Sequence, residues 1–324
     1  MNLITKGNFE SIFGKFLIRE LERYKEHISQ NILLSFDNVD SKVQKDGQIV
    51  RVAILYEPCA VMPENYSSKK VQKFDLVFCL NSFFQNESYK RIVTLQQPIR
   101  RPNKSFFGNT NRVNSHLVFI GDNKFSASKT SQYSYRRKLI SSLERQNFRV
   151  DLYGPNWNSG RVLEFRRRFA ALRRGLRNPS CFSIGEVFSS CFKHQASHVG
   201  ESIDKMLTQS RYNFAIVIEN DRFALTEKVY DSIFSGCVTF YKGPHLKNPV
   251  LENLLIRLPE DIQNAVELIG SEMLHDQSHR IESMKTYVSD AESMIETSPE
   301  YIARQIAKGI ESFLLDMEHA DNDR

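Results

Sequence analysis

The sequence predicts an α/β protein of two domains, and three observations support this prediction. Short apolar runs rich in β-branched residues alternate with helical stretches along most of the chain. Several of these runs are apolar at consecutive positions, which is typical of parallel strands that helices cover on both faces. The chain has 324 residues, whereas a single hydrophobic core stops growing at about 250 to 300 residues.

Eight apolar runs are expected to be strands, with helices between most of them. They span residues 32–36, 49–56, 74–80, 91–95, 117–120, 149–153, 214–218 and 238–241.

A polar segment between the fourth and fifth runs is expected to link the two domains. Residues 97–115 contain Pro98, Pro102 and Gly108 among polar and basic residues, without helical or strand periodicity. We therefore predict an N-terminal domain of residues 1–105 and a C-terminal domain of residues 106–297.

The last part of the sequence is expected to be helical. From residue 259 onward the pattern suggests one helix after another, and Ser298-Pro299 is a plausible helix start with proline at the first helical position. Residues 298–324 are therefore expected to form a terminal helix and tail.

Composition limits the partners without choosing among them. The 44 basic residues exceed the 38 acidic ones, which favours anionic ligands: nucleic acid, nucleotide, acidic glycan or an anionic membrane. Five scattered cysteines without a Cys-x-x-Cys pair argue against a disulfide framework. No apolar stretch approaches the roughly 18 residues of a membrane-spanning helix, so we expect a soluble, cytoplasmic protein.

The segment 211–243 carries the chemistry. Glu219 and Asn220 follow the expected strand 214–218, at the edge where open α/β sheets bind their ligands. Thr226 is expected to cap the next helix, with Glu227 and Lys228 in its first turn. Free backbone N–H groups at a helix start favour an anion.

In that setting, the charge of Lys228 suits a diphosphate, and Glu227 could accept hydrogen bonds from sugar or ribose hydroxyls. The plainer alternative is that Glu227 is only a favourable first-turn acid and Lys228 a solvated surface lysine.

These residues resemble the donor-binding signature of the α-1,3/1,4-fucosyltransferase family. The pattern E-N-x5-T-E-K at 219–228 is followed by S-G-C-V at 235–238 and Y-x-G at 241–243, and GESIDKMLTQSRYNF at 200–214 is similar to the family's lead-in. Weaker similarity covers R-x-x-L-x-x-x-L from Arg136, VDLYG at 150–154, YEPCAVMPENY at 56–66 and FDLVFCLN at 74–81.

The resemblance implies a GT-B fold, in which two Rossmann-like lobes face a cleft, with acceptor contacts mainly N-terminal and GDP-fucose mainly C-terminal. It implies that Lys228 and Arg136 hold the donor diphosphate, that Glu227 and Asn220 bind donor hydroxyls, and that Glu57 is the general base. The expected partners are a nucleotide sugar and a glycan acceptor. No metal or other cofactor is expected.

Glu57 also suits this role from its own position. It ends an apolar strand and precedes the strand-breaking Pro58, so its carboxylate should lie at a sheet's C-terminal edge. One base suffices for an inverting displacement when fixed cations stabilise the leaving nucleotide. The alternative is a strand-end carboxylate that neighbouring groups satisfy.

Two departures from the family pattern leave the sugar open. Ala224 replaces the usual tyrosine before the T-E-K element, and Thr239 replaces the usual proline after S-G-C-V. Two alternatives therefore remain: the same fold with another nucleotide sugar, or a non-catalytic module that binds an anionic glycan or nucleic acid.

Residues 161–177 are expected to form a basic amphipathic helix. Val162, Phe165, Phe169, Leu172 and Leu176 form one stripe among seven arginines. The preferred interpretation is that the stripe packs on the donor lobe. The alternative is that the helix rests on an anionic membrane, as on the inner membrane face, or on an acidic glycan. Nucleic acid is not expected, because the sequence has no recognition motif for it.

Overall fold

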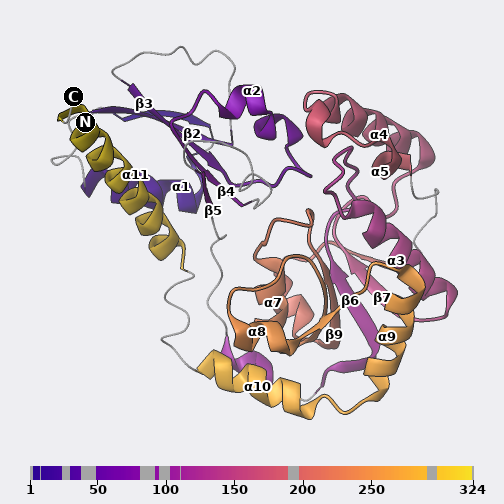
Figure 1. Cartoon of the computed structure of the whole chain (residues 1–324). Coiled ribbons are helices and arrows are strands. Elements are labelled where there is room, and N and C mark those ends of the chain that lie inside the picture. Colours follow the sequence, from indigo (N-terminus) through magenta and orange to yellow (C-terminus); the bar gives the residue numbers. More distant parts are fainter. Residues whose placement is uncertain are drawn as a thin grey trace. The chain divides into compact units, whose positions relative to one another are not determined.

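The protein is described by a computed structural model (Figure 1). The structure describes residues 3–7, 9–23, 30–37, 49–80, 92–94, 103–109, 111–188, 197–289 and 298–322. The chain divides into two compact units. Unit 1 comprises Met1–Ile99 together with Ile295–Arg324, and unit 2 comprises Arg100–Met294.

Unit 1 is built on a five-stranded sheet in which neighbouring strands are parallel and follow chain order. Its strands are β1 (Leu3–Gly7), β2 (Asn31–Phe36), β3 (Ile49–Leu55), β4 (Leu76–Cys79) and β5 (Ile92–Thr94). The first four expected strands correspond to β2 through β5. Strand β1 was not predicted, because its short sequence LITKG lies at the sheet edge and is largely exposed.

The helices of unit 1 come from both ends of the chain. They are α1 (Ile12–Arg23), α2 (Ser68–Val71), the 3-10 turn η1 (Pro63–Tyr66) and α11 (Pro299–Asn322). Helix α11, drawn in yellow in Figure 1, packs against α1 and β4. It begins at Pro299 as the sequence predicts, and the Ser298 hydroxyl accepts a hydrogen bond from the backbone of Tyr301 at 3.1 Å.

Unit 2 has a six-stranded parallel sheet of order β11-β10-β9-β6-β7-β8. The strands are β6 (Val113–Ile120), β7 (Arg149–Tyr153), β8 (His198–Gly200), β9 (Tyr212–Ile218), β10 (Val238–Lys242) and β11 (Leu255–Arg257). The chain adds strands first on one side of β6 and then on the other. The order therefore reverses between β6 and β9, which is where sheets of this kind place their ligands.

Helices of unit 2 cover both faces of this sheet. They are α3 (Tyr133–Arg145), α4 (Arg161–Gly175), α5 (Ile184–Phe188), α6 (Lys205–Gln209), α7 (Lys228–Phe234), α8 (Pro249–Leu254), α9 (Ile262–Leu274) and α10 (Ser278–Ser289), with 3-10 turns η3 (Lys104–Gly108) and η4 (Pro179–Cys181).

Strand β6 shows why the apolar runs lack alternation. Leu117 and Phe119 are buried in the main core together with side chains of α3 and α9, whereas Val118 belongs to a separate cluster with Ala215 and Cys237. Both faces of the strand are therefore buried. The prediction of an α/β protein with two parallel-sheet, Rossmann-like domains is confirmed.

The expected linker is only partly described. Residues 97–102 and 110 lie outside the described residues, while η3 and the start of β6 fall within the segment. The terminal helix, which the sequence did not assign to either domain, belongs to unit 1. Of the helices that the structure describes, none is long and apolar enough to cross a membrane.

The preferred interpretation of helix α4 is wrong. Its apolar stripe does not pack on unit 2, since Val162, Phe165, Phe169 and Leu176 are all exposed, and Leu172 is half-buried. The helix instead buries Arg168, Ala171 and Gly175. Arg168 can be buried because it lies over the ring of Phe125 and pairs with Glu164.

Candidate functional site

The candidate site of unit 2 begins where β9 ends. Glu219 follows the strand directly and is completely buried. Its carboxylate accepts hydrogen bonds from the Thr226 backbone N–H at 3.1 Å and from the Thr226 hydroxyl at 2.6 Å, and the Lys228 ammonium lies 3.6 Å away. Burial raises the pKa of Glu219, while Lys228 and Thr226 oppose that rise.

Thr226 does not cap helix α7, so the sequence prediction for this residue is wrong. The N-cap position belongs to Glu227, and the Glu227 side chain makes no capping hydrogen bond. The Thr226 hydroxyl instead donates to Glu219 and accepts a hydrogen bond from the Lys228 ammonium at 2.9 Å. The hydroxyl oxygen that would accept from a backbone N–H in a cap accepts from the charged Lys228 instead, and charge-assisted hydrogen bonds are the stronger ones, so Glu219 and Lys228 determine the orientation of Thr226. The expected end of the helix is confirmed, because Gly236 follows it with φ of 75°.

Glu227 pairs with a lysine that sequence reasoning did not assign. The Lys205 ammonium, from the start of α6, donates to Glu227 Oε1 at 3.0 Å. Burial opposes ionisation of Glu227, but Lys228 and Lys205 outweigh it and lower the pKa of Glu227 to about 2. Glu227 is therefore an acceptor at neutral pH. In the sequence, Lys205 is 22 residues from Glu227, and no local pattern indicates that they meet.

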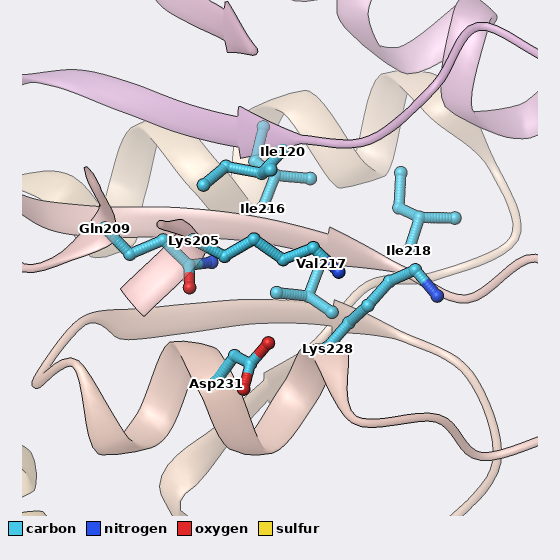
Figure 2. A pocket seen from close by; sticks show the side chains of 8 residues that line it. All are labelled: Ile120, Lys205, Gln209, Ile216, Val217, Ile218, Lys228 and Asp231. Atoms are coloured by element: carbon cyan, nitrogen blue, oxygen red, sulfur yellow. The ribbon is translucent and has the colours of Figure 1, made fainter. Parts of the chain in front are cut away.

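A small pocket lies between these lysines (Figure 2). Its polar lining is Lys205, Gln209, Lys228 and Asp231, and its apolar lining is Ile120, Ile216, Val217 and Ile218. Figure 2 shows Lys205 and Lys228 extending in the same direction along the strand that carries Ile216 and Ile218. The buried Gln209 Oε1 has no hydrogen-bond partner among the described residues. Two ammonium groups on one side of a pocket favour an anion, which would share them with the carboxylates that already pair with them, Glu227 with Lys205 and Glu219 with Lys228.

Arg136 and Asn220 meet just beyond the end of β9. The Arg136 guanidinium donates to Asn220 Oδ1 at 3.1 Å, to the Ile218 carbonyl at 2.8 Å and to the Asp122 carbonyl at 3.0 Å. Burial lowers the pKa of Arg136, although neighbouring groups that include Glu219 and Asp122 oppose this effect. Arg136 ties the ends of β6 and β9 together.

The role that the resemblance implies for Arg136 stays a prediction. The side chain is 2% exposed, and only its Nε lacks a partner among the described residues. A direct contact with a diphosphate would therefore require the guanidinium to become accessible.

Glu57 lies in unit 1, just after the end of β3. Its backbone N–H donates to Asp37 Oδ1 at 2.9 Å, the Tyr56 N–H donates to the same oxygen at 2.7 Å, and the Tyr66 hydroxyl donates to the Glu57 carbonyl at 2.8 Å. The backbone of Glu57 is thus fixed at the C-terminal edge of the sheet, as expected.

Asp37 was not predicted from the sequence as part of this arrangement. It follows the end of β2, with a positive φ of 47°. Burial raises the pKa of Asp37 to about 6, and the charge of Glu57 adds to the rise against the two backbone hydrogen bonds. The only sequence signal for Asp37 is an acidic residue directly after an apolar strand.

The described residues include no candidate metal site. Among the described residues, no group of three or more His, Cys, Asp or Glu side chains could hold a metal ion.

Comparison with known proteins gives likeness in structure and none in sequence. No family model matches the chain, and no curated protein matches it. Among solved structures, it resembles the α,α-trehalose 6-phosphate synthase of Burkholderia multivorans (TM-score 0.52, 9% identity, covering 98% of this chain and 78% of that one). It also resembles a glycosyltransferase of Rickettsia africae (TM-score 0.50, 11% identity, 95% and 84% covered).

A third similar structure is a point mutant of TarM from S. aureus, in complex with fondaparinux, α-GlcNAc-glycerol and UDP (TM-score 0.50, 13% identity, 92% of this chain covered). The chain spans about three fifths of the length of TarM (58%) and of the pneumococcal O-GlcNAc transferase GtfA (59%). At such low identity these likenesses show the fold alone. The chain has the GT-B fold, with two Rossmann-like units, and the comparisons do not single out the fucosyltransferases.

Proposed function

We propose that this protein is an inverting glycosyltransferase that binds a nucleotide sugar on unit 2 and transfers the sugar to a hydroxyl of a glycan acceptor. The observation that carries the proposal is the pair of lysines, Lys205 and Lys228, at the C-terminal end of β9. They lie beside the point where the strand order of a Rossmann-like sheet reverses, which is where such sheets bind nucleotides.

The charges of this site suit a diphosphate. Lys228 is held in place by Thr226 and Glu219, so its ammonium is positioned before a ligand arrives. Lys205 is 44% exposed and can serve as a second cation. Fixed cations stabilise the negative charge that develops on a leaving nucleoside diphosphate.

Glu227 and Asn220 are proposed to hold donor hydroxyls. Glu227 is ionised at neutral pH because its pKa is lowered to about 2, so its carboxylate oxygens can accept hydrogen bonds from ribose or sugar hydroxyls as well as from Lys205. The Asn220 side chain uses its oxygen to accept from Arg136, and this fixes its orientation.

Glu57 is proposed as the general base in the transfer step. The acceptor O–H gives its proton to the Glu57 carboxylate while the acceptor oxygen forms a bond to the anomeric carbon. The bond between that carbon and the diphosphate oxygen breaks, and the nucleoside diphosphate leaves with the electron pair. No second acid is needed when cations stabilise the leaving group.

Two donors are candidates, and they share the diphosphate. The E-N-x5-T-E-K pattern favours GDP-fucose, whereas the likeness to TarM, whose structure contains UDP, favours a UDP-sugar. Ala224 is completely buried. Thr239 is also buried, and its hydroxyl shares a hydrogen bond of 2.8 Å with the Ser232 hydroxyl. Neither side chain is exposed to contact a nucleotide sugar in place of the family's tyrosine and proline. The motif alone therefore does not determine which sugar is transferred.

The experiment that tests the proposal is a nucleoside diphosphate release assay. GDP-fucose, GDP-mannose, UDP-glucose and UDP-N-acetylglucosamine are each incubated with the protein, with and without a panel of glycan acceptors. We expect acceptor-dependent release from at least one donor. Nucleotide binding without release from any donor, whatever the acceptor, would favour the non-catalytic binding module.

The Glu57→Gln variant separates chemistry from binding in this assay. It preserves the shape of the side chain but removes its basicity, and loss of a general base typically lowers a rate by about 10² to 10⁴. We expect transfer to fall by that order while nucleotide affinity stays unchanged. Near-normal turnover would assign Glu57 a structural role, and Glu64 would be the next candidate base.

A further inference from the structure

Helix α4 presents an apolar stripe to solvent. Val162, Phe165, Phe169 and Leu176 are 72%, 59%, 64% and 63% exposed. With 3.6 residues per turn, the four side chains fall within a sector of roughly 60° around the helix axis. Contiguous exposed apolar side chains that polar residues border mark interaction surfaces.

The buried face of the helix fixes the direction of the stripe. Arg168 and Ala171 are buried, and a Cβ at Gly175 would lie only 2.5 Å from the Ala127 side chain. Arg167 anchors the same side, because its guanidinium donates to the Asn123 carbonyl at 2.7 Å. The helix therefore cannot turn its apolar stripe inward without breaking these contacts.

Arginines line the stripe on the solvent side. Arg166, Arg173 and Arg177 are exposed and occupy the adjacent sector of roughly 40°, while Arg161 and Arg174 are exposed elsewhere on or at the helix. Within residues 161–188, all of which are described, the exposed residues include no acidic side chain. Glu164 and Glu186 are part-buried and bonded to Arg168 and Ser134. The positive charge of this surface is thus not neutralised locally.

Helix α5 lies next to α4 and also exposes apolar side chains. It packs against α4, as Figure 1 shows, and it exposes Ile184 and Phe188 at 58% and 52%. The α4–α5 surface, defined by Val162, Phe165, Phe169, Leu176, Ile184 and Phe188 with the flanking arginines, is therefore both apolar and strongly basic.

We propose that the α4–α5 surface docks on an anionic lipid bilayer. The apolar side chains would enter the boundary between headgroups and acyl chains, and the arginines would contact the lipid phosphates, as in other basic amphipathic helices that lie in the interface. A second copy of the chain is a poorer occupant. Pairing α4 with α4 brings two rows of arginines together with no exposed carboxylate between them. The proposal does not depend on the proposed transferase activity.

The test is co-sedimentation of the full chain with lipid vesicles. We expect binding to vesicles that contain phosphatidylglycerol and no binding to pure phosphatidylcholine. Each arginine near an anionic surface contributes roughly fivefold to affinity. Arg166→Glu with Arg173→Glu should therefore weaken binding at least about tenfold, and so should Phe165→Ser with Phe169→Ser.

Matched controls lie elsewhere in unit 2. Lys138→Glu with Arg145→Glu reverses two exposed charges on α3, and Leu274→Ser removes an apolar side chain that is 88% exposed. These variants should bind like the native chain. All substituted side chains are exposed, so thermal unfolding of each variant should match that of the native chain.

Several outcomes would overturn the proposal. One is absence of binding to anionic vesicles, and another is binding that survives either the arginine or the phenylalanine exchange. The third is a dimer that requires Phe165 and Phe169 in the absence of vesicle binding, which would make the stripe a protein interface. Heparin binding without vesicle binding would likewise replace the membrane with an acidic glycan.

Discussion

Lys228 has both a structural and a proposed binding role. Its ammonium lies beside the fully buried carboxylate of Glu219, and it also lines the pocket in which a diphosphate is proposed to bind. The sequence motif identified Lys228 and Glu227. It did not reveal that Glu219 and Lys205 are their partners, because those pairings depend on how α6, α7 and β9 are packed.

The Lys228–Glu219 pair should be visible in stability. Lys228→Ala leaves Glu219 buried without its cation, and breaking a buried ion pair in this way costs up to about 3 to 5 kcal/mol. Lys228→Ala combined with Glu219→Gln removes the unpaired charge, so the double variant should regain part of the lost free energy of unfolding. Urea denaturation of the three proteins measures this. A double variant that is less stable than the single one would mean that Glu219 is stabilised mainly by Thr226.

Asp37 should make stability depend on pH. Its pKa is about 6 in the folded chain, against an ordinary value of 3.8 that applies to the unfolded one. The folded state therefore binds this proton more tightly, and the contribution of Asp37 to stability rises as the pH falls through that window. Asp37→Asn removes the titration and keeps an oxygen to accept from Tyr56 and Glu57. From about pH 7 to about pH 4, the native chain should gain stability relative to this variant.

Urea denaturation at several pH values checks the sign of this effect. A native chain that loses stability relative to Asp37→Asn on acidification would show that Asp37 is stabilised in its ionised form by groups other than the two backbone donors.

At the scale of elements, the turn after α7 adopts a conformation that needs glycine. Gly236 has φ of 75°, and a Cβ there would lie 2.5 Å from Arg112 Nη2. Arg112 donates to the carbonyls of Gly236, Ser235, Tyr212 and Phe106 at 2.6 to 3.1 Å. It thereby joins the end of α7 to the start of β9.

Gly236→Ala should destabilise the protein. The left-handed conformation costs a residue with a side chain about 1 to 2 kcal/mol, and displacing Arg112 adds to this. Gly160→Ala is the matched control, since Gly160 has φ of −62° and an added Cβ there would have nothing within 4 Å. Thermal unfolding should show a lower midpoint for Gly236→Ala only. Equal midpoints for the two variants would contradict this account of the turn.

Helix α4 shows what periodicity does and does not predict. The spacing of apolar residues correctly predicts a helix with two distinct faces, because α4 spans Arg161–Gly175. The rule that the apolar face packs inward fails here. Arg168 is buried over Phe125 and paired with Glu164, so a charged residue takes the inner face. The burial of Arg168 depends on the ring of Phe125, which lies outside the helix and so outside the helical pattern.

At the scale of the whole molecule, the sequence predicts the sheets better than their edges. Runs that are buried on both faces, such as residues 214–218 of β9 and 52–55 of β3, stand out as continuous apolar segments. Strands β1, β8 and β11, which were not predicted, are only three to five residues long, lie at sheet edges and are partly exposed or, for β11, directly follow a helix.

The return of the chain to unit 1 was also not predictable from local sequence. Helix α11 buries Ile302, Ile306 and Ile310, and Gly309 leaves room for Phe78 of β4, whose ring would lie 3.1 Å from an added Cβ. The amphipathic pattern indicates that α11 packs on something. Only the tertiary structure shows that its partner is at the other end of the sequence.

The central claim is that unit 2 binds the diphosphate of a nucleotide sugar between Lys205 and Lys228. Calorimetric titration of GDP and UDP into the native chain, Lys228→Ala, Lys205→Ala and the exposed-lysine control Lys247→Ala tests it most directly. A charge-assisted hydrogen bond contributes about 1.5 to 3 kcal/mol, or roughly ten- to hundredfold in affinity. We predict that one of the nucleotides binds, that Lys228→Ala and Lys205→Ala each weaken it by that order, and that Lys247→Ala does not. Unchanged affinity in both site variants, under conditions in which they remain folded, would contradict the claim.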